Sequence, residues 1–265
     1  MESTSANASL QYCKVQDEGR LRVVTLNRPE VMNALHSEAG HELERVWNEF
    51  AARDDLWVGI VTGAGERAFC AGNDLKVQAA GKRGPRPQSG FGGLTGRFDL
   101  NKPLIAAVNG VAMGGGFELA LACDIIVAAE NAVFALPEPR VGLIAAAGGV
   151  HRLPRIIPQK QALGMILTGR RVSAKEGREL GFVNEVVAVG EALSAAKRWA
   201  QQILECSPMA VRASKQAIYR GLDESDLATA IRTVYPAQQA NLESQDYLEG
   251  PKAFAGKRKP NWQNR

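Results

Sequence analysis

The stretch Asn-Gly-Val-Ala-Met-Gly-Gly-Gly-Phe-Glu-Leu-Ala, residues 109–120, decides the fold that the rest of the chain must fit. It follows a fully apolar run, Leu104–Val108, and together they predict a buried strand, a tight turn and a short buried helix. Three consecutive glycines before a helix are costly unless another group must approach the backbone closely. The start of a helix presents unpaired N–H groups and the positive end of its dipole. The segment therefore predicts a turn that can hold an oxyanion.

Glu118 falls in the first turn of this predicted helix, inside an otherwise apolar face. A carboxylate in such a place is a candidate acid–base group. It is equally a favourable first-turn charge, with the glycines serving only close packing. Taken alone, the segment leaves both interpretations open.

Two further segments carry candidate site residues. Residues 134–144, Phe-Ala-Leu-Pro-Glu-Pro-Arg-Val-Gly-Leu-Ile, place Glu138 between two prolines that would fix the direction of its carboxylate. The alternative is a surface glutamate in a turn, paired with Arg140. Residues 68–76, Ala-Phe-Cys-Ala-Gly-Asn-Asp-Leu-Lys, have small side chains that would let a backbone N–H reach a ligand, and Asp74 is a candidate N-cap.

Strand and helix patterns alternate over the first two thirds of the chain. Strands are predicted at residues 21–26, 57–62, 104–108 and 125–128, and helices at 37–53 and 115–124. This alternation is typical of an α/β core. Beyond about residue 191 the strand pattern ends, and helices are predicted at 192–205, 208–221 and 224–241. We therefore predict a core over residues 1–191 and a C-terminal helical subdomain over residues 192–265.

Residues 77–99 are rich in glycine and proline and have few large apolar side chains. This composition predicts a mobile surface loop. A loop of this length often serves as a lid over a binding site.

Composition and charge narrow the class of protein. The chain has 265 residues, 45% of them hydrophobic, and a net charge of +4, which suits a globular protein with an anionic ligand such as a nucleotide phosphate. Four scattered cysteines without a Cys-X-X-Cys pair predict reduced thiols. The polar N-terminus does not have the pattern of a targeting segment, and the apolar runs are far shorter than a membrane span. We expect a cytoplasmic protein.

Other chemistry-bearing residues do not have the setting that their function needs. His36, His41 and His151 have no metal-ligand spacing, so surface or packing roles and no metal site are expected. The basic run Lys257–Lys259 has no accompanying aromatic platform, which gives little support for nucleic-acid binding.

In their order along the chain, these segments resemble the crotonase superfamily of coenzyme A thioester enzymes, and the resemblance covers nearly the whole chain. Residues 27–35 look like its N-terminal signature, and residues 68–76 like its Ala-Phe-small-Ala-Gly-x-Asp-Leu loop. Residues 109–118 and 136–149 are similar to its two catalytic segments, and residues 249–258 to its C-terminal motif.

The resemblance implies a spiral of ββα turns with a C-terminal helical subdomain that builds a homotrimer, often paired into a hexamer. It implies an oxyanion hole made by the amides of Asn73 and Gly115, two catalytic glutamates, Glu118 and Glu138, and no metal or cofactor beyond the coenzyme A (CoA) of the substrate. Phe254 and Lys257 would reach the nucleotide end of CoA bound to a neighbouring subunit. All residues that match CoA-binding positions are Arg28, Val31, Arg67, Ala71, Asp74, Leu75, Phe254 and Lys257.

The pair of glutamates favours enoyl-CoA hydratase activity, because isomerases of the superfamily usually keep only one acid here. Carnitinyl-CoA dehydratase-like activity and isomerisation are alternatives, and an RNA-binding homologue is an alternative of a different class. One departure concerns residues 145–149, Ala-Ala-Ala-Gly-Gly, where many hydratases have Pro-Gly or Pro-Asp before the turn. Three alanines predict a small, uncharged wall of the acyl pocket. Such a wall disfavours a cationic acyl group, which needs an acid or an aromatic cage.

Overall fold

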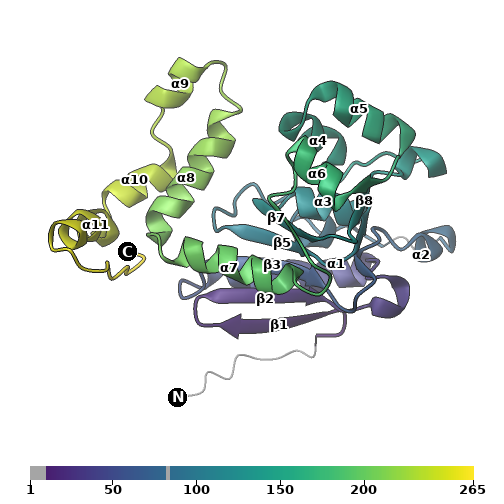
Figure 1. Cartoon of the computed structure of the whole chain (residues 1–265), viewed down its shortest axis with the longest axis horizontal. Helices are drawn as coiled ribbons and strands as arrows, with labels where there is room; N and C mark the ends of the chain where they lie inside the picture. The colour runs from purple at the N-terminus through teal and green to yellow at the C-terminus, as the bar shows by residue number, and fades with distance from the viewer. Residues whose placement is uncertain (1–9, 82–83) are drawn as a thin grey trace.

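The computed structural model describes residues 10–81 and 84–265 (Figure 1). Residues 1–9, which were interpreted as free of a targeting signal, and residues 82–83 of the predicted loop lie outside this range.

Two sheets form the core. The larger has the order β1-β2-β3-β5-β7-β10, with β1 (Cys13–Glu18), β2 (Leu21–Leu26), β3 (Val58–Gly63), β5 (Leu104–Val108), β7 (Ile125–Ala129) and β10 (Glu185–Val187). The smaller has the order β4-β6-β8-β9, with β4 (Ala68–Cys70), β6 (Val111–Met113), β8 (Val133–Ala135) and β9 (Val172–Ser173).

The chain alternates between the two sheets. It runs from β3 to β4, from β5 to β6 and from β7 to β8, and neighbouring strands of this series are parallel within each sheet. Each turn thus adds one strand to each sheet, which is the predicted spiral. The antiparallel strands β1 and β9 lie at the edges of the two sheets.

Helices cover both faces of the larger sheet. The predicted amphipathic helix, α1 (Ser37–Ala52), buries Leu43, Trp47 and Phe50 in the core that it shares with the smaller sheet. On the opposite face, α7 (Ala192–Leu204) packs small alanines against the strands. The other helices of the first 191 residues are α2 (Leu75–Ala79), α3 (Gly115–Leu121), α4 (Gly149–Ile156), α5 (Gln159–Thr168) and α6 (Ala174–Leu180), with 3₁₀ turns η1 (Pro29–Val31), η2 (Phe91–Gly93) and η3 (Glu138–Val141).

The last part of the chain is helical, as predicted, but it is divided differently. Its helices after α7 are α8 (Pro208–Gly221), α9 (Leu227–Arg232), α10 (Pro236–Leu242) and α11 (Gln245–Ala255). The single helix predicted at 224–241 is wrong, because Thr233 leaves the helical conformation and Pro236 starts a new helix. In Figure 1, α8 to α11 extend away from the sheets, whereas α7 lies on them. The predicted division of the chain between residues 191 and 192 stays a prediction. α7 lies just after this boundary and packs on the core.

The predicted loop at 77–99 is only partly a surface loop. Residues 75–79 form α2, whereas Ser89, Leu94 and Thr95 are buried. Ser89 donates two hydrogen bonds to Glu44 of α1, and the backbone of Gly93 lies so close to Glu44 that a side chain would not fit. Its glycines permit close packing here, so the prediction of a surface loop is wrong for residues 89–95, whereas its mobility and its role as a lid stay predictions. In the part of the chain that the structure covers, no helix has both the length and the apolar character needed to cross a bilayer.

Candidate active site

The candidate residues meet at one edge of the smaller sheet. β4, β6 and β8 are neighbouring parallel strands, so their carboxyl ends lie side by side. Gly72 and Asn73 follow β4, Gly114 and Gly115 follow β6, and Glu138 follows β8. Three segments that are far apart in the sequence therefore deliver their residues to the same place, and α3 adds Glu118 from the turn after Gly115.

Backbone amides line this edge. Gly115 is the first residue of α3, so its N–H has no acceptor within the helix. A side chain on Gly72 would lie 3.1 Å from that nitrogen, which shows how closely the β4 end approaches Gly115. Leu35 bonds to the Gly72 carbonyl and to the Asp74 amide, so the N–H of Asn73 between them points away from Leu35. The amides of Asn73 and Gly115 thus belong to two adjoining segments beside one cavity.

Glu118 is almost completely buried at this edge. Its Oε1 accepts a hydrogen bond of 2.8 Å from the Gly149 N–H at the start of α4. Burial raises the pKa of Glu118 to about 7, with a further contribution from Glu138, while the Gly149 and Ala147 amides oppose the rise. A carboxyl group with a pKa near neutrality can both give and take a proton under ordinary conditions.

Glu138 lies across Gly114 from this group. A side chain on Gly114 would stand 2.7 Å from Oε1 of Glu138, and Gly114 has φ 53° and ψ −125°, a conformation that suits only glycine. Burial raises the pKa of Glu138 as well. Its Oε2 is buried and has no hydrogen-bond partner among the described residues. The alternative of a surface glutamate paired with Arg140 is wrong, because Arg140 instead donates to the Thr168 carbonyl.

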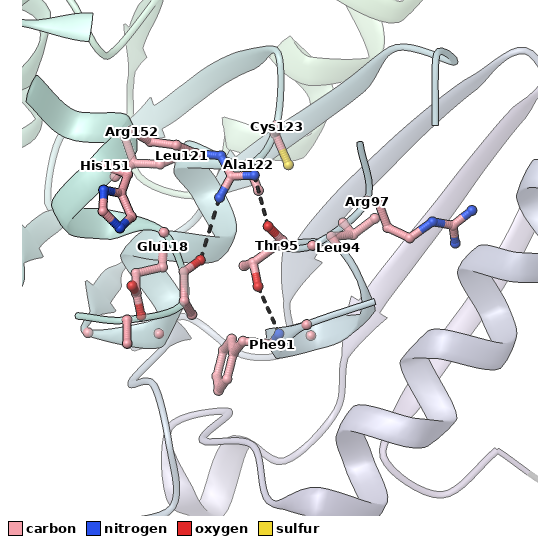
Figure 2. Close-up of a pocket in the computed structure, with 18 of the residues that line it drawn as sticks. Phe91, Leu94, Thr95, Arg97, Glu118, Leu121, Ala122, Cys123, His151 and Arg152 are labelled. Carbon is pink, nitrogen blue, oxygen red and sulfur yellow. Dashed lines mark hydrogen bonds between the residues drawn. The ribbon is translucent and has the colours of Figure 1, made fainter. Parts of the chain in front are cut away.

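A cavity of about 1530 Å³ connects these groups. Figure 2 shows Glu118 on its wall, with Phe91 on one side and His151 and Arg152 on the other. Such a volume exceeds that of most small-molecule sites and suits a long ligand. The candidate residues that line it are Ala71, Asn73, Asp74, Leu75, Gly115, Glu118 and Glu138.

A family model described as enoyl-CoA hydratase/isomerase matches residues 16–265 of the chain. A carnitinyl-CoA dehydratase of Proteus mirabilis is 44% identical over 264 residues, which cover 96% of this chain and 99% of that relative. The chain belongs to the enoyl-CoA hydratase/isomerase family. Among solved structures, an enoyl-CoA hydratase from Mycobacterium marinum is 39% identical with a TM-score of 0.90, and one from Mycobacterium tuberculosis is 36% identical with a TM-score of 0.89. Each comparison covers 96% of this chain and 99% of the other. These relatives are hydro-lyases, and the crotonase fold is confirmed.

Five of the candidate CoA-binding residues do not line this cavity. Arg28 donates to Asp74 at 3.2 Å and to the Ala34 carbonyl, which ties the segment after β2 to the start of α2. Asp74 also accepts a bond from the Val77 N–H, as an N-cap does, which confirms that prediction. The five residues are Arg28, Val31, Arg67, Phe254 and Lys257. Their contacts with CoA stay predictions.

Phe254 and Lys257 do not lie on one helical face. α11 ends at Ala255, and Lys257 has a left-handed φ of 49°. Beyond this point the tail is held in place: Trp262 donates to the Glu205 carbonyl, and Asp246 accepts from the amides of Gln263 and Asn264. The end of the chain is therefore held against the rest of the structure.

Phe91, His151 and Arg152 line the cavity beside the candidate residues but were not predicted as site residues. The ring of Phe91 lies on Gly115, where a side chain would come within 2.7 Å of it. His151 and Arg152 come from α4, directly after the Gly149 amide that bonds Glu118. The only signal in the sequence was that His151 and Arg152 lie next to the Gly148-Gly149 turn. The expected surface or packing role of His151 did not take this position into account.

Proposed function

We propose that this protein catalyses the reversible addition of water to a 2-enoyl-CoA thioester. The observation that carries the proposal is the pair of glutamates with raised pKa values at one cavity, beside the first amide of α3. We infer a CoA thioester as the substrate because the chain belongs to the enoyl-CoA hydratase/isomerase family. No metal or redox cofactor takes part in the proposed reaction.

The amides of Asn73 and Gly115 would hold the thioester oxygen. Negative charge collects on this oxygen when the nucleophile attacks Cβ, and donors that are already in position lower the barrier. Loss of one such donor typically costs about 3 kcal/mol. The close contact between the β4 and β6 ends supports this assignment, because it places the two segments that carry these amides side by side.

Glu118 and Glu138 would handle the protons. The oxygen of water bonds to Cβ while one carboxylate takes a proton from that water, and the other carboxyl group gives a proton to Cα. One group must therefore be ionised and the other neutral, which two neighbouring acids in an apolar site achieve readily. The unpartnered Oε2 of Glu138 offers an acceptor for the attacking water. We assign the two roles to the pair jointly.

Substitution of each glutamate tests the proposal. Glu118→Gln and Glu138→Gln should each lower kcat for crotonyl-CoA at least about 10²-fold, since acid–base catalysis contributes that much. Glu130→Gln, at an exposed turn after β7, is the matched control and should leave the rate unchanged. Loss of the enoyl absorbance measures turnover. Wild-type rates in either glutamate variant would rule out the two-carboxylate mechanism.

Dehydration of carnitinyl-CoA is the second candidate. It is favoured by the 44% identity to a protein of that name, and it uses the same pair of acids in the reverse direction. The two candidates differ in the acyl group, so turnover of crotonobetainyl-CoA relative to crotonyl-CoA distinguishes them.

Self-association into a trimer or hexamer is also part of the proposal. α8, its C-cap residue and α9 expose large apolar side chains, Ile218, Leu222, Leu227 and Ile231, each more than 60% accessible. A patch of this kind usually marks a protein interface. Light scattering should give a mass three or six times that of the chain, and Ile231→Glu should lower it. A monomer at micromolar concentration would contradict the assignment.

A further inference from the structure

One wall of the cavity carries an excess of positive charge beside the reacting groups. α4 contributes His151, Arg152 and Arg155 to the cavity lining, and Figure 2 shows His151 and Arg152 next to Glu118. The inference drawn from this wall rests on the proposed function, because it concerns the acyl group of the same thioester.

Arg152 is the central residue of this wall. Its Nη2 donates to the Thr95 carbonyl at 2.8 Å, and its Nη1 lies 3.5 Å from the Ala147 carbonyl (Figure 2). Among the described residues it forms no ion pair with a carboxylate, although Glu118 attracts its charge. Main-chain carbonyls satisfy donors but do not cancel a charge. Within the part of the chain that the structure describes, Arg155 likewise bonds only to a carbonyl, that of His151.

Asp124, another acid that lines the cavity, does not balance this charge, because it has its own cation. It forms an ion pair of 2.7 Å with Lys215 and accepts a hydrogen bond from Tyr219. The cations of α4 thus remain in excess.

The same wall is poorly suited to a cationic acyl group. The ring of Phe98 could face a quaternary ammonium, but the Arg152 guanidinium already lies 5.5 Å from its centre. The adjoining residues 145–147 are alanines, which add neither charge nor an aromatic ring.

We infer that the acyl subsite selects a 2-enoyl group whose distal end carries a carboxylate, bound by His151, Arg152 and Arg155. Charge-assisted hydrogen bonds from guanidinium and imidazole donors are the usual means of recognising a carboxylate. The ring of His151 has no hydrogen-bond partner within the described residues, so its N–H is available to donate to such a group.

Three thioesters that differ only in the group on Cγ test the inference. Crotonyl-CoA carries hydrogen, glutaconyl-CoA a carboxylate and crotonobetainyl-CoA a trimethylammonium. We expect kcat/KM to be at least about tenfold higher for glutaconyl-CoA than for crotonyl-CoA, and lowest for crotonobetainyl-CoA. Equal values for glutaconyl- and crotonyl-CoA, or a preference for crotonobetainyl-CoA, would overturn the inference and leave the hydratase proposal intact.

Two variants assign the preference to this wall. His151→Leu and Arg155→Gln should each reduce the glutaconyl-to-crotonyl ratio several-fold, whereas Lys14→Gln, an exposed charge on β1, should leave the ratio unchanged. An unchanged ratio in both α4 variants would refute the assignment.

Calorimetric binding of the saturated thioesters gives a reading that does not depend on catalysis. Glutaryl-CoA should bind more tightly than butyryl-CoA. If no enoyl-CoA is turned over but this order of binding holds, the proposed function fails while the inference stands. The reverse order of binding would sink the inference whatever the catalytic result.

Discussion

Burial of Glu118 should make the protein less stable at high pH, and Glu118→Gln should remove this cost. The pKa of Glu118 rises from the ordinary glutamate value of 4.5 to about 7 in the folded protein. Each pKa unit corresponds to about 1.4 kcal/mol, so ionising this buried group costs about 3 kcal/mol of stability. Glutamine has the same shape and can still accept the Gly149 N–H.

The sign and the pH window follow from the direction of the shift. The native carboxyl group holds its proton more tightly than the unfolded one, so stability falls as the pH rises from 4.5 to 7. Below 4.5 both states are protonated and Glu118 contributes nothing. At pH 8 the glutamine variant should therefore be more stable by about 3 kcal/mol, and at pH 5 by less than about 1 kcal/mol.

Urea unfolding of both proteins at pH 5 and pH 8, at equal protein concentration, measures this difference. Glu42→Gln is the control. Glu42 is a buried glutamate that accepts hydrogen bonds from the amides of Gln11, Tyr12 and Cys13. Its replacement should destabilise the protein by roughly 1–3 kcal/mol. The reasoning is refuted if Glu118→Gln is less stable than wild type at pH 8, or if its gain is the same at both pH values.

Three further predictions concern the turn, the loop and the tail. Gly114→Ala should lower kcat at least about 10²-fold, because its methyl group would displace the Glu138 carboxylate. Gly19 also has a positive φ, 60°, but has open space around it, so Gly19→Ala should leave kcat unchanged in the same absorbance assay. Hydrogen exchange should be slower at residues 89–95, which pack on α1, than at residues 75–81; equal rates in the two segments would contradict the packing described here. Lys257→Ala should raise KM for an acyl-CoA more than for an acyl-pantetheine, which lacks the nucleotide; equal effects would exclude contact with the nucleotide of a neighbouring subunit.

Long strands and long amphipathic helices could be predicted from the sequence because they repeat a pattern. β2, β5 and α1 agree with their predicted ranges to within one residue. The strands that hold the site could not be predicted this way, since β4, β6 and β8 have three residues each and are too short to show an alternation. The glycines after β4 and β6 and the prolines after β8 were visible in the sequence, but the strands themselves were not.

The two errors have different physical origins. The helix predicted at 224–241 overlooked a local signal, because Pro236 starts a new helix and Thr233 before it is extended. The glycines of residues 90–93 predicted mobility, yet Gly93 lies against the backbone of α1. In the loop the tertiary partner decides the outcome, and a local pattern does not reveal it.

The topology explains why three ambiguous segments together indicate one site. Taken alone, Glu118 could be a first-turn charge, Glu138 a surface residue and Asn73 part of a turn. Parallel neighbours β4, β6 and β8 end at the same edge, so any residue that follows one strand must lie beside those that follow the others. Two acids whose burial is costly and a glycine with a positive φ then meet in one place. In a fold that needed only stability, such destabilising features would be scattered or absent. Their presence together at this edge therefore argues for catalysis there.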